Sequence, residues 1–592
     1  MWQFFRYNAI VQNRKFTPNR WDGVALLIVF TCLVLLASAA RQMSVPYHLG
    51  EPIAISLALS KLPGYALQTV LRMFIALFFS LLFTFTVGTL AAKNKHAQKV
   101  IIPIIDILQS IPVMGFLTIT VVGFIEIFPG NLLGVQCAAI FAIFTSQVWN
   151  MVLSFYQSLL TLPGELKEAA DMFHLSSWQR FWRVEVPFAM PGLLWNTMLS
   201  MSASWFFVVA SEAVTVSNQT ITLPGIGSYI TLAIAQKNMH AIFYTILCMF
   251  CVILIYDQLL FRPLIQWSDR FRLEQPLSSQ TKNSWIAQLF RRTVLFQYAG
   301  KLIAFLTDKW INFRLFNLTK RPTSYSKFSL HFSLPHWMSQ KNINLFFVGV
   351  WYIVLTLTIV FGVINLGKFI SHSITFSETR HVLFLGLCTL LRVLSIVFVS
   401  TLIWLPIGVW IGLRPRLAEI IQPIVQFLAA FPANLLFPLF VILIVHYNLN
   451  VDIWTTPLMF LGTQWYILFN VIAGASAIPK DIRQAADNFG VKGLLWWKRL
   501  ILPGVFPYYI TGAITAAGNA WNTSTLAEIV SWGNITLHAH GLGAYIMTYS
   551  AKGNFPLLVV GIGVMSIYVL TLNHLVWRPL YRLAQKRYQM DG

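Results

Sequence analysis

Long, nearly uncharged apolar runs recur along the 592-residue chain, for example at 23–40, 73–92, 345–366 and 557–572. Each approaches the roughly 20 residues that a helix needs to cross the hydrocarbon core of a bilayer. Lipid offers the backbone no hydrogen bonds, so only helices and closed barrels can span it. The alternating pattern of barrel strands is absent from these runs. The sequence therefore predicts an all-α membrane protein.

Twelve membrane-spanning helices are predicted, six in each half of the chain. They cover about 23–40, 66–92, 101–126, 132–160, 190–213, 241–261, 345–366, 383–412, 418–446, 455–475, 505–528 and 554–576. The net charge is +22, and the strongly basic connectors all fall on one side of this alternation, as cytoplasmic loops do. We therefore predict that both termini are cytoplasmic, and we interpret the charge as topology rather than nucleic-acid binding. A short helix is also predicted at 53–62, near the outer surface.

A basic segment, 269–343, separates the two halves and carries apolar residues such as Trp285, Phe305 and Trp310 at roughly helical spacing. This pattern is typical of amphipathic helices that lie on the anionic cytoplasmic leaflet. An ordinary solvated linker is the alternative. We predict a first domain over 1–268, this linker, and a second domain over 344–592.

The two halves repeat one another in the same direction. An offset of 320 residues pairs Pro112 with Pro432, and beyond the fourth span an offset of 316 pairs Trp205 with Trp521. One deletion of four residues accounts for the change. Because each half contains an even number of spans, the repeats are parallel, and a pseudo-two-fold axis along the membrane normal would relate them. The transport pathway is then expected between the halves.

Two basic loops, 163–187 and 479–503, occupy equivalent places between the fourth and fifth spans of each half. Each predicts a helix–turn–helix, with a proline at its start, an acidic residue near the positive end of the helix dipole, and in the second copy Gly490 at the turn. Two equivalent helical projections on one face are suited to docking a two-fold symmetric soluble partner.

Both loops resemble the EAA loop of ABC importer permeases, E-A-A-x3-G-x9-I-x-L-P. The resemblance implies two fused six-helix type I permease domains, each with a coupling helix that docks one subunit of an ATPase dimer at the cytoplasmic face. The residues that it assigns to ATPase coupling are Glu165, Glu168, Ala169, Ala170, Asp171 and His174 in the first copy, and Asp481, Gln484, Ala485, Ala486, Asp487 and Gly490 in the second.

Two positions depart from this pattern. Gln484 stands in place of the glutamate in the second loop, and His174 stands in place of the glycine in the first. We expect the two halves to dock their ATPase subunits non-identically. His174 could be a pH-sensitive turn residue or an ordinary solvated one.

A second resemblance lies around the fifth spans. Trp205, Glu212 and a following Gly-x-Gly-x-Tyr sequence, like Trp521, Glu528 and the sequence at 541–545, are similar to permeases of the nitrate/sulfonate/taurine/bicarbonate type. The resemblance implies an importer in a bacterial inner membrane, for a small anionic solute that a periplasmic binding protein delivers. Separate identical chains are the common arrangement in that group, so the fusion is a departure.

Charged residues inside apolar spans are candidates for pathway or gating roles. They are Glu212, Glu528, Arg72, Arg392 and Asp106, whose counterpart is Gln426. The alternative for the two glutamates is structural: they would be satisfied by the two arginines or by backbone N–H groups of the adjoining glycine turn. The arginines could instead bind an anionic solute or a lipid phosphate.

The chain has no G-x-x-x-x-G-K-[ST] loop, so ATP and Mg²⁺ are expected on a separate ATPase chain. No cofactor, metal site or enzymatic centre is predicted in this chain. An ion-coupled secondary transporter with twelve spans is the alternative, and it would require several buried acids. A membrane enzyme or scaffold is a third possibility. The scarcity of acids and the two EAA-like loops favour the importer permease.

Overall fold

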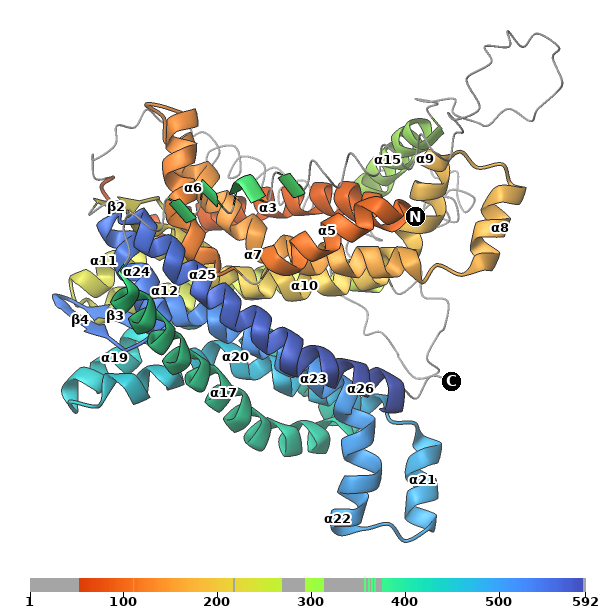
Figure 1. Ribbon diagram of the computed structural model, residues 1–592. Coiled ribbons are helices and arrows are strands. Elements are labelled where there is room, and N and C mark those ends of the chain that lie inside the picture. The colour runs from red at the N-terminus through yellow and green to blue at the C-terminus, as the bar shows by residue number, and fades with distance from the viewer. Residues whose placement is uncertain are drawn as a thin grey trace.

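The computed structural model describes residues 53–109, 111–216, 219–268, 293–312 and 375–588, with separate positions between 356 and 368. The predicted first span, 23–40, lies outside these residues, as do much of the seventh, 345–366, and the linker apart from 293–312. Within them, helices dominate and run side by side in a bundle (Figure 1). The predicted all-α membrane fold is confirmed.

The first half is built from long helices joined by short turns. Its elements are η1 (Leu59–Lys61), α3 (Leu62–Phe83), η2 (Thr84–Gly88), α4 (Thr89–Lys93), α5 (Lys95–Leu108), α6 (Val113–Ile127), α7 (Leu133–Leu160), α8 (Gly164–Met172), α9 (Ser177–Arg180), η3 (Phe181–Glu185), α10 (Val186–Ser211), β1 (Ala213–Val216), β2 (Gln219–Thr222), α11 (Ile226–Ala235), α12 (Met239–Tyr256), η4 (Asp257–Phe261) and α13 (Arg262–Ser268). One helix of the linker follows, α15 (Val294–Asn312).

The second half repeats this order. Its elements are α17 (Phe376–Gly412), α18 (Pro415–Ala430), η6 (Ala433–Leu435), α19 (Phe437–His446), α20 (Val451–Ala477), α21 (Lys480–Asn488), α22 (Gly493–Trp496), η7 (Trp497–Ile501), α23 (Leu502–Ala527), β3 (Ile529–Trp532), β4 (Ile535–His538), α24 (Leu542–Lys552), α25 (Phe555–Leu572), η8 (Asn573–Trp577) and α26 (Arg578–Tyr588). In the described part of the chain, eight helical stretches are long and apolar enough to cross a membrane.

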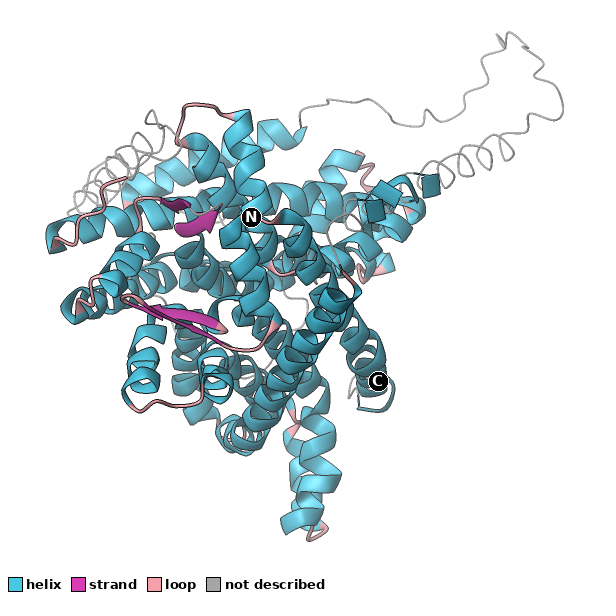
Figure 2. Ribbon diagram, turned by 60° about the vertical axis from the view of Figure 1, so that its left-hand side comes forward, coloured by secondary structure: helices cyan, strands magenta, loops and turns pink. Residues whose placement is uncertain are grey.

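The bundle has two distinct ends. The antiparallel pairs β1–β2 and β3–β4 lie at one end, called here the hairpin end, whereas α8, α21 and α22 project from the other, called the loop end (Figure 1). Figure 2 shows both strand pairs on the same side of the molecule. The two hairpins directly follow α10 and α23, and the sequence analysis did not predict them.

The predicted continuous spans at 101–126 and 418–446 are wrong. Each is two helices: α5 ends at Leu108 before α6, and α18 ends at Ala430 before α19. Pro112 and Pro432 lie at the breaks in extended conformation, with ψ of 127° and 106°. Proline has no N–H to donate, and its ring keeps the preceding residue out of the helical region. Both halves therefore turn in mid-bundle at equivalent places.

The predicted helix at 53–62 is also wrong, because residues 53–58 have no regular structure and the helical chain begins at Leu59. The four-residue deletion falls earlier than the fourth span. The counterpart of α6 is η6 together with α19, because the offset of 320 pairs Val113 with Ala433. Gln136 pairs with Asp452 at the offset of 316, so the four residues are lost between these two positions. From the next helix onward the offset of 316 holds.

The two halves are packed into one another rather than merely adjacent. Helix α6 of the first half packs against α23, α24 and α25 of the second, and α18 of the second packs against α10 of the first. At the hairpin end, the backbone N–H of Gly533 donates to the carbonyl of Ile234 at 3.1 Å. A pathway between the halves is therefore enclosed by helices from both.

Candidate functional site

The two loops predicted to dock a partner leave the bundle in the same way. Pro163 and Pro479 cap the helices, so α8 begins at Gly164 and α21 at Lys480. All twelve residues assigned to coupling lie in these two helices or in the turn that follows each. Glu165, Glu168, Asp171, Asp481, Gln484 and Asp487 are exposed, whereas Ala170 is buried against the loop. Asp171 pairs with Arg180 at 3.3 Å, and the other acidic side chains are exposed for a partner.

The turns that follow α8 and α21 explain why the EAA-like motif has a glycine at this position. His174 and Gly490 both have positive φ, 49° and 66°. In the first loop, the N–H of His174 donates to Asp171 and that of Leu175 to Ala170, and the second loop forms the same pair of bonds. This is a Schellman turn, which satisfies the last carbonyls of a helix and needs a left-handed residue. The histidine adopts the glycine conformation.

We expect His174→Gly to stabilise the first loop by about 1 kcal/mol, because a residue with a Cβ is strained in the left-handed region. Hydrogen exchange of the α8 amides should slow several-fold. The matched variant Gly490→His should speed exchange in α21 by a similar factor. Equal exchange in all three proteins would contradict this account of the turn.

Phenylalanines missed by the sequence analysis stand beside these turns. Phe173 and Phe489, 316 residues apart, are 78% and 85% exposed, and Met172 is 80% exposed. Large apolar side chains exposed at a projecting tip mark a contact surface. The repeated Ala-Ala-Asp-x-Phe sequence could have revealed them.

Only the first loop is braced by the linker among the described residues. Trp310 of α15 packs edge-on against Trp178 of α9, with ring centroids 4.8 Å apart, and its carbonyl accepts from the Trp178 indole at 3.3 Å. Arg183 also donates to Asn312 at 3.0 Å. Helix α15 exposes Leu302, Phe305 and Leu306 elsewhere. This part of the linker is helical, as predicted, and its contact with a membrane stays a prediction.

A buried ion pair lies at the hairpin end of the first half. Arg72 of α3 and Glu212, which ends α10, are both fully buried, and the guanidinium lies 2.5 Å from the carboxylate. Thr69 donates to the same carboxylate at 2.7 Å, and Gln136 accepts from Arg72 at 2.7 Å. The second carboxylate oxygen accepts the N–H of Gly227 at 2.7 Å. Glu212 thus ties α3, α10 and α11 together.

The second half repeats the pair with one change. Arg392 lies 2.8 Å from Glu528, which also accepts from Thr389 and from the N–H of Gly543. Where the first half has Gln136, the second has Asp452, whose carboxylate lies 3.1 Å from Arg392. Each predicted glutamate therefore pairs with the predicted arginine of its own half. This is the arrangement expected if the glutamates have a structural role.

Two glycines in each half allow this approach. An added Cβ on Gly225 or Gly541 would overlap the carboxylate of Glu212 or Glu528, and one on Gly227 would overlap the carbonyl of Val209. The first glycine of the Gly-x-Gly motif leaves room for the carboxylate of the glutamate, and the second allows its helix to pack closely against the end of the preceding one. This explains why the glutamate and the glycines recur together at the same offset.

Asp106 has a different partner from the other candidates. It lies on α5, and its carboxylate is 2.6 Å from Arg578 at the start of α26 in the second half. The equivalent residues do not pair: Arg262 contacts Asp257, and the amide of Gln426 lies near the sulfur of Met198. The ion pair between the halves is therefore one-sided.

We expect a double-mutant cycle of Asp106→Asn and Arg578→Gln to give a coupling free energy of about 1 kcal/mol, the range of a partly exposed pair with good geometry. Unfolding in a detergent titration would measure it. The swapped variant Asp106→Arg with Arg578→Asp should recover part of the loss. A coupling free energy near zero would contradict the pair.

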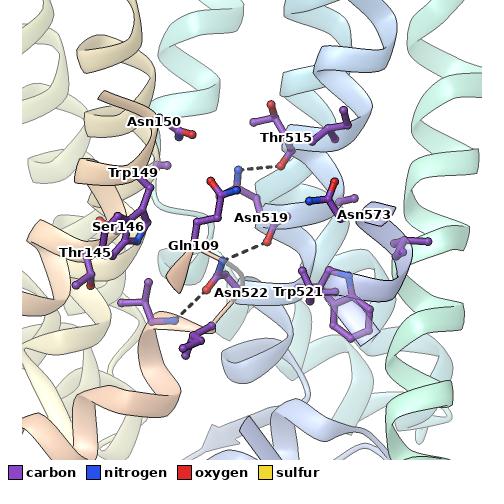
Figure 3. Close-up of a pocket in the computed structure, with 18 of the residues that line it drawn as sticks. Gln109, Thr145, Ser146, Trp149, Asn150, Thr515, Asn519, Trp521, Asn522 and Asn573 are labelled. Atoms are coloured by element: carbon purple, nitrogen blue, oxygen red, sulfur yellow. Dashed lines mark hydrogen bonds between the residues drawn. The ribbon is translucent and has the colours of Figure 1, made fainter. Parts of the chain in front are cut away.

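A cavity lies between the halves, beside the break at Pro112. Its volume is about 210 Å³, and α7 and α10 of the first half and α23 and η8 of the second contribute to its wall. Its amide and hydroxyl lining residues, all labelled in Figure 3, are Gln109, Thr145, Ser146, Asn150, Thr515, Asn519, Asn522 and Asn573. No Asp, Glu, Lys or Arg is among the described lining residues. The wall can donate and accept hydrogen bonds without a net charge.

Comparison with known proteins identifies the architecture. Residues 84–262 and 405–585 each match the family described as binding-protein-dependent transport system inner membrane component. The chain belongs to this family. It is a membrane permease with two such domains in tandem, as the repeat predicted. Each matched segment contains one projecting loop and the glutamate of one buried ion pair, whose arginine, Arg72 or Arg392, precedes the segment.

Individual permeases are similar at lower coverage. The chain is 25% identical to the taurine transport system permease protein TauC of Escherichia coli over 187 residues, which are 31% of this chain and 64% of that protein. It is 23% identical to the bicarbonate transport system permease protein CmpB of Synechococcus elongatus over 188 residues, 32% and 61% of the two chains. It is 26% identical to the nitrate import permease protein NrtB of Synechocystis over 125 residues, which are 21% of this chain and 42% of that protein. The matches with TauC and CmpB span about three fifths of those proteins.

Within the described ranges, no group of three or more His, Cys, Asp or Glu side chains is placed to hold a metal ion.

The cavity residues were not predicted from the sequence, because asparagines and threonines inside apolar helices are common and only packing shows which of them meet.

Proposed function

We propose that this permease is the transmembrane subunit of an ATP-driven ABC importer that carries a small anionic solute delivered by a periplasmic binding protein. The observation that carries the proposal is the pair of projecting loops, which expose acidic residues and a phenylalanine at equivalent positions. Two equivalent surfaces at one end suit an ATPase dimer. The names of the similar permeases support a taurine-, bicarbonate- or nitrate-like solute.

The loop end would then face the cytoplasm of the bacterial cell, and the hairpin end would face the binding protein across the inner membrane. Both termini would be cytoplasmic. ATP and Mg²⁺ would be held by the ATPase subunits. Closure of the ATPase dimer would pull α8 and α21 together, and the rigid helices α10 and α23 would carry that movement to the cavity between the halves.

We further propose distinct roles for the buried charges. Glu212, Glu528, Arg72 and Arg392 are outside the lining of the cavity, so they hold the hairpin end together rather than contact the solute. Asp106 and Arg578 lie on the loop-end side of the cavity. Helix α5 runs from the loop end through Asp106 to Gln109 of the cavity wall, and the chain runs from Asn573 of that wall through Arg578 toward the loop end. Their pair would link the halves on the cytoplasmic side of the solute.

Purification of the full-length chain from its native cells would test the proposal. An ATPase chain should co-purify, and its ATP hydrolysis should rise when the cognate binding protein is added with solute. Solute uptake by the purified chain alone, driven by an ion gradient, would overturn the proposal in favour of a secondary transporter.

A further inference from the structure

The cavity between the halves has a symmetry mate that is nearly closed. The equivalent position, lined by Ala429, Gly462 and Tyr466 among others, holds a cavity of only about 20 Å³. That is room for about one water molecule, against about 210 Å³ on the other side. The fused chain therefore opens to one side of its pseudo-two-fold axis.

Paired substitutions along the repeat produce this difference. The polar residues Gln109, Ser146, Asn150 and Asn522 line the larger cavity, and their counterparts at offsets of 320 and 316, which line the smaller one, are Ala429, Gly462, Tyr466 and Phe206. Asn519 and its counterpart Ala203 line both cavities. Three amides and a hydroxyl thus stand on one side where an alanine, a glycine and two aromatic rings stand on the other. Two identical chains could not differ in this way.

Part of the polar wall is held rigidly. The side-chain oxygen of Asn522 accepts the backbone N–H of Val113 at 3.0 Å, and its amide donates to the carbonyl of Gly518 (Figure 3). The amide of Asn519 donates to the carbonyl of Thr515 at 3.0 Å. The first of these bonds joins α6 of the first half to α23 of the second at the cavity wall, and the other two lie within α23. The wall is therefore preorganised before a solute enters.

Other polar groups are left without partners. Trp521 is 3% exposed and lines the cavity, and its indole N–H has no hydrogen-bond partner within the described residues. The side chains of Asn150, which is exposed, and Asn573, which is half-buried, also make no hydrogen bond within the described residues, so their amides are accessible to a ligand. An indole N–H can only donate, and each amide brings two donors. The buried Trp521 donor without a partner is costly, so the cavity suits a ligand rich in acceptors.

We propose that this one-sided cavity is the solute-binding site of the permease, and that it takes a small oxyanion such as a sulfonate through neutral donors. The inference rests on the proposed transport function and adds to it the place of the site and its chemistry. No acidic side chain lines the described wall to repel an anion. The solute would cross beside the axis, against α7 and α23, rather than on it.

Reaction of introduced cysteines with a sulfonate reagent tests the site without requiring transport. The full-length chain, with its five native cysteines replaced by alanine, would carry Gln109→Cys, Ala429→Cys, Ser146→Cys or Gly462→Cys. All four positions are half-buried, and they form two pairs related by the repeat. Each variant would be treated in membranes with 2-sulfonatoethyl methanethiosulfonate and with its trimethylammonium analogue, and unmodified thiol would be counted afterwards.

We expect the sulfonate reagent to modify Gln109→Cys and Ser146→Cys roughly tenfold faster than their mates, and faster than the cationic reagent does, since one hydrogen bond to a charged group accounts for a factor of that size. Equal rates within both pairs would overturn the one-sided cavity. Faster modification by the cation would overturn the anion class. Because neither result depends on an ATPase, failure here is distinguishable from failure of the proposed importer function.

Discussion

We expect Glu212→Ala to lower the free energy of unfolding of the permease by about 3–5 kcal/mol, because it leaves the fully buried Arg72 without a carboxylate partner. The variant also removes the acceptor for Thr69 and for the N–H of Gly227. The attachment of α3 and α11 to the end of α10 would be lost with it. Unfolding of the purified chain in a denaturing detergent would measure the change, and solute uptake should fall with it.

The second half supplies the matched comparison. Glu528→Ala should be milder than Glu212→Ala, because Asp452 remains 3.1 Å from Arg392, whereas the first half has only the neutral Gln136 at that place. Glu528→Ala should still impair transport. Combining Gln136→Asp with Glu212→Ala should restore part of the lost stability. Equal losses for both alanine variants, with no rescue, would contradict this account of the two pairs.

Replacing both Phe173 and Phe489 by alanine should uncouple the permease from its ATPase while leaving its fold intact. Each side chain is more than three-quarters exposed, so little packing inside the chain is lost. An aromatic anchor in a partner's pocket contributes about 2 kcal/mol, so each replacement should weaken association roughly 30-fold. Titration of the solubilised permease with the ATPase subunit, followed by ATP hydrolysis, would measure both effects.

A control of the same residue type is available in the membrane-spanning part. Phe384 of α17 is 58% exposed and far along the helix from the loop end, so Phe384→Ala should bind the ATPase normally. The single variants Phe173→Ala and Phe489→Ala should differ if the two loops dock non-identically, as Gln484 and His174 suggest. Unchanged binding in the double variant would remove the phenylalanines from the interface.

Much of the candidate site was accessible to sequence reasoning because it is repeated. The offset of 316 residues singled out both EAA-like loops, and Glu212 and Glu528 with their glycines, without any knowledge of contacts. His174 was recognised as standing in the glycine position, and its left-handed backbone follows from the Schellman turn. Phe173 and Phe489 recur at the same offset but were overlooked, because an isolated aromatic residue in a loop suggests burial as readily as exposure.

The sequence by itself determined the membrane-spanning helical class, the tandem repeat and the loops on one face, since each is expressed in local hydropathy or in a fixed spacing along the chain. Only the tertiary structure decided that the spans at 101–126 and 418–446 break at proline, that Asp106 meets Arg578, and that a polar cavity opens on one side of the axis. The two breaks follow from local proline geometry, which the apolar character of these segments conceals. The ion pair and the cavity depend on side chains hundreds of residues apart, and no periodicity within a segment records which of them come together.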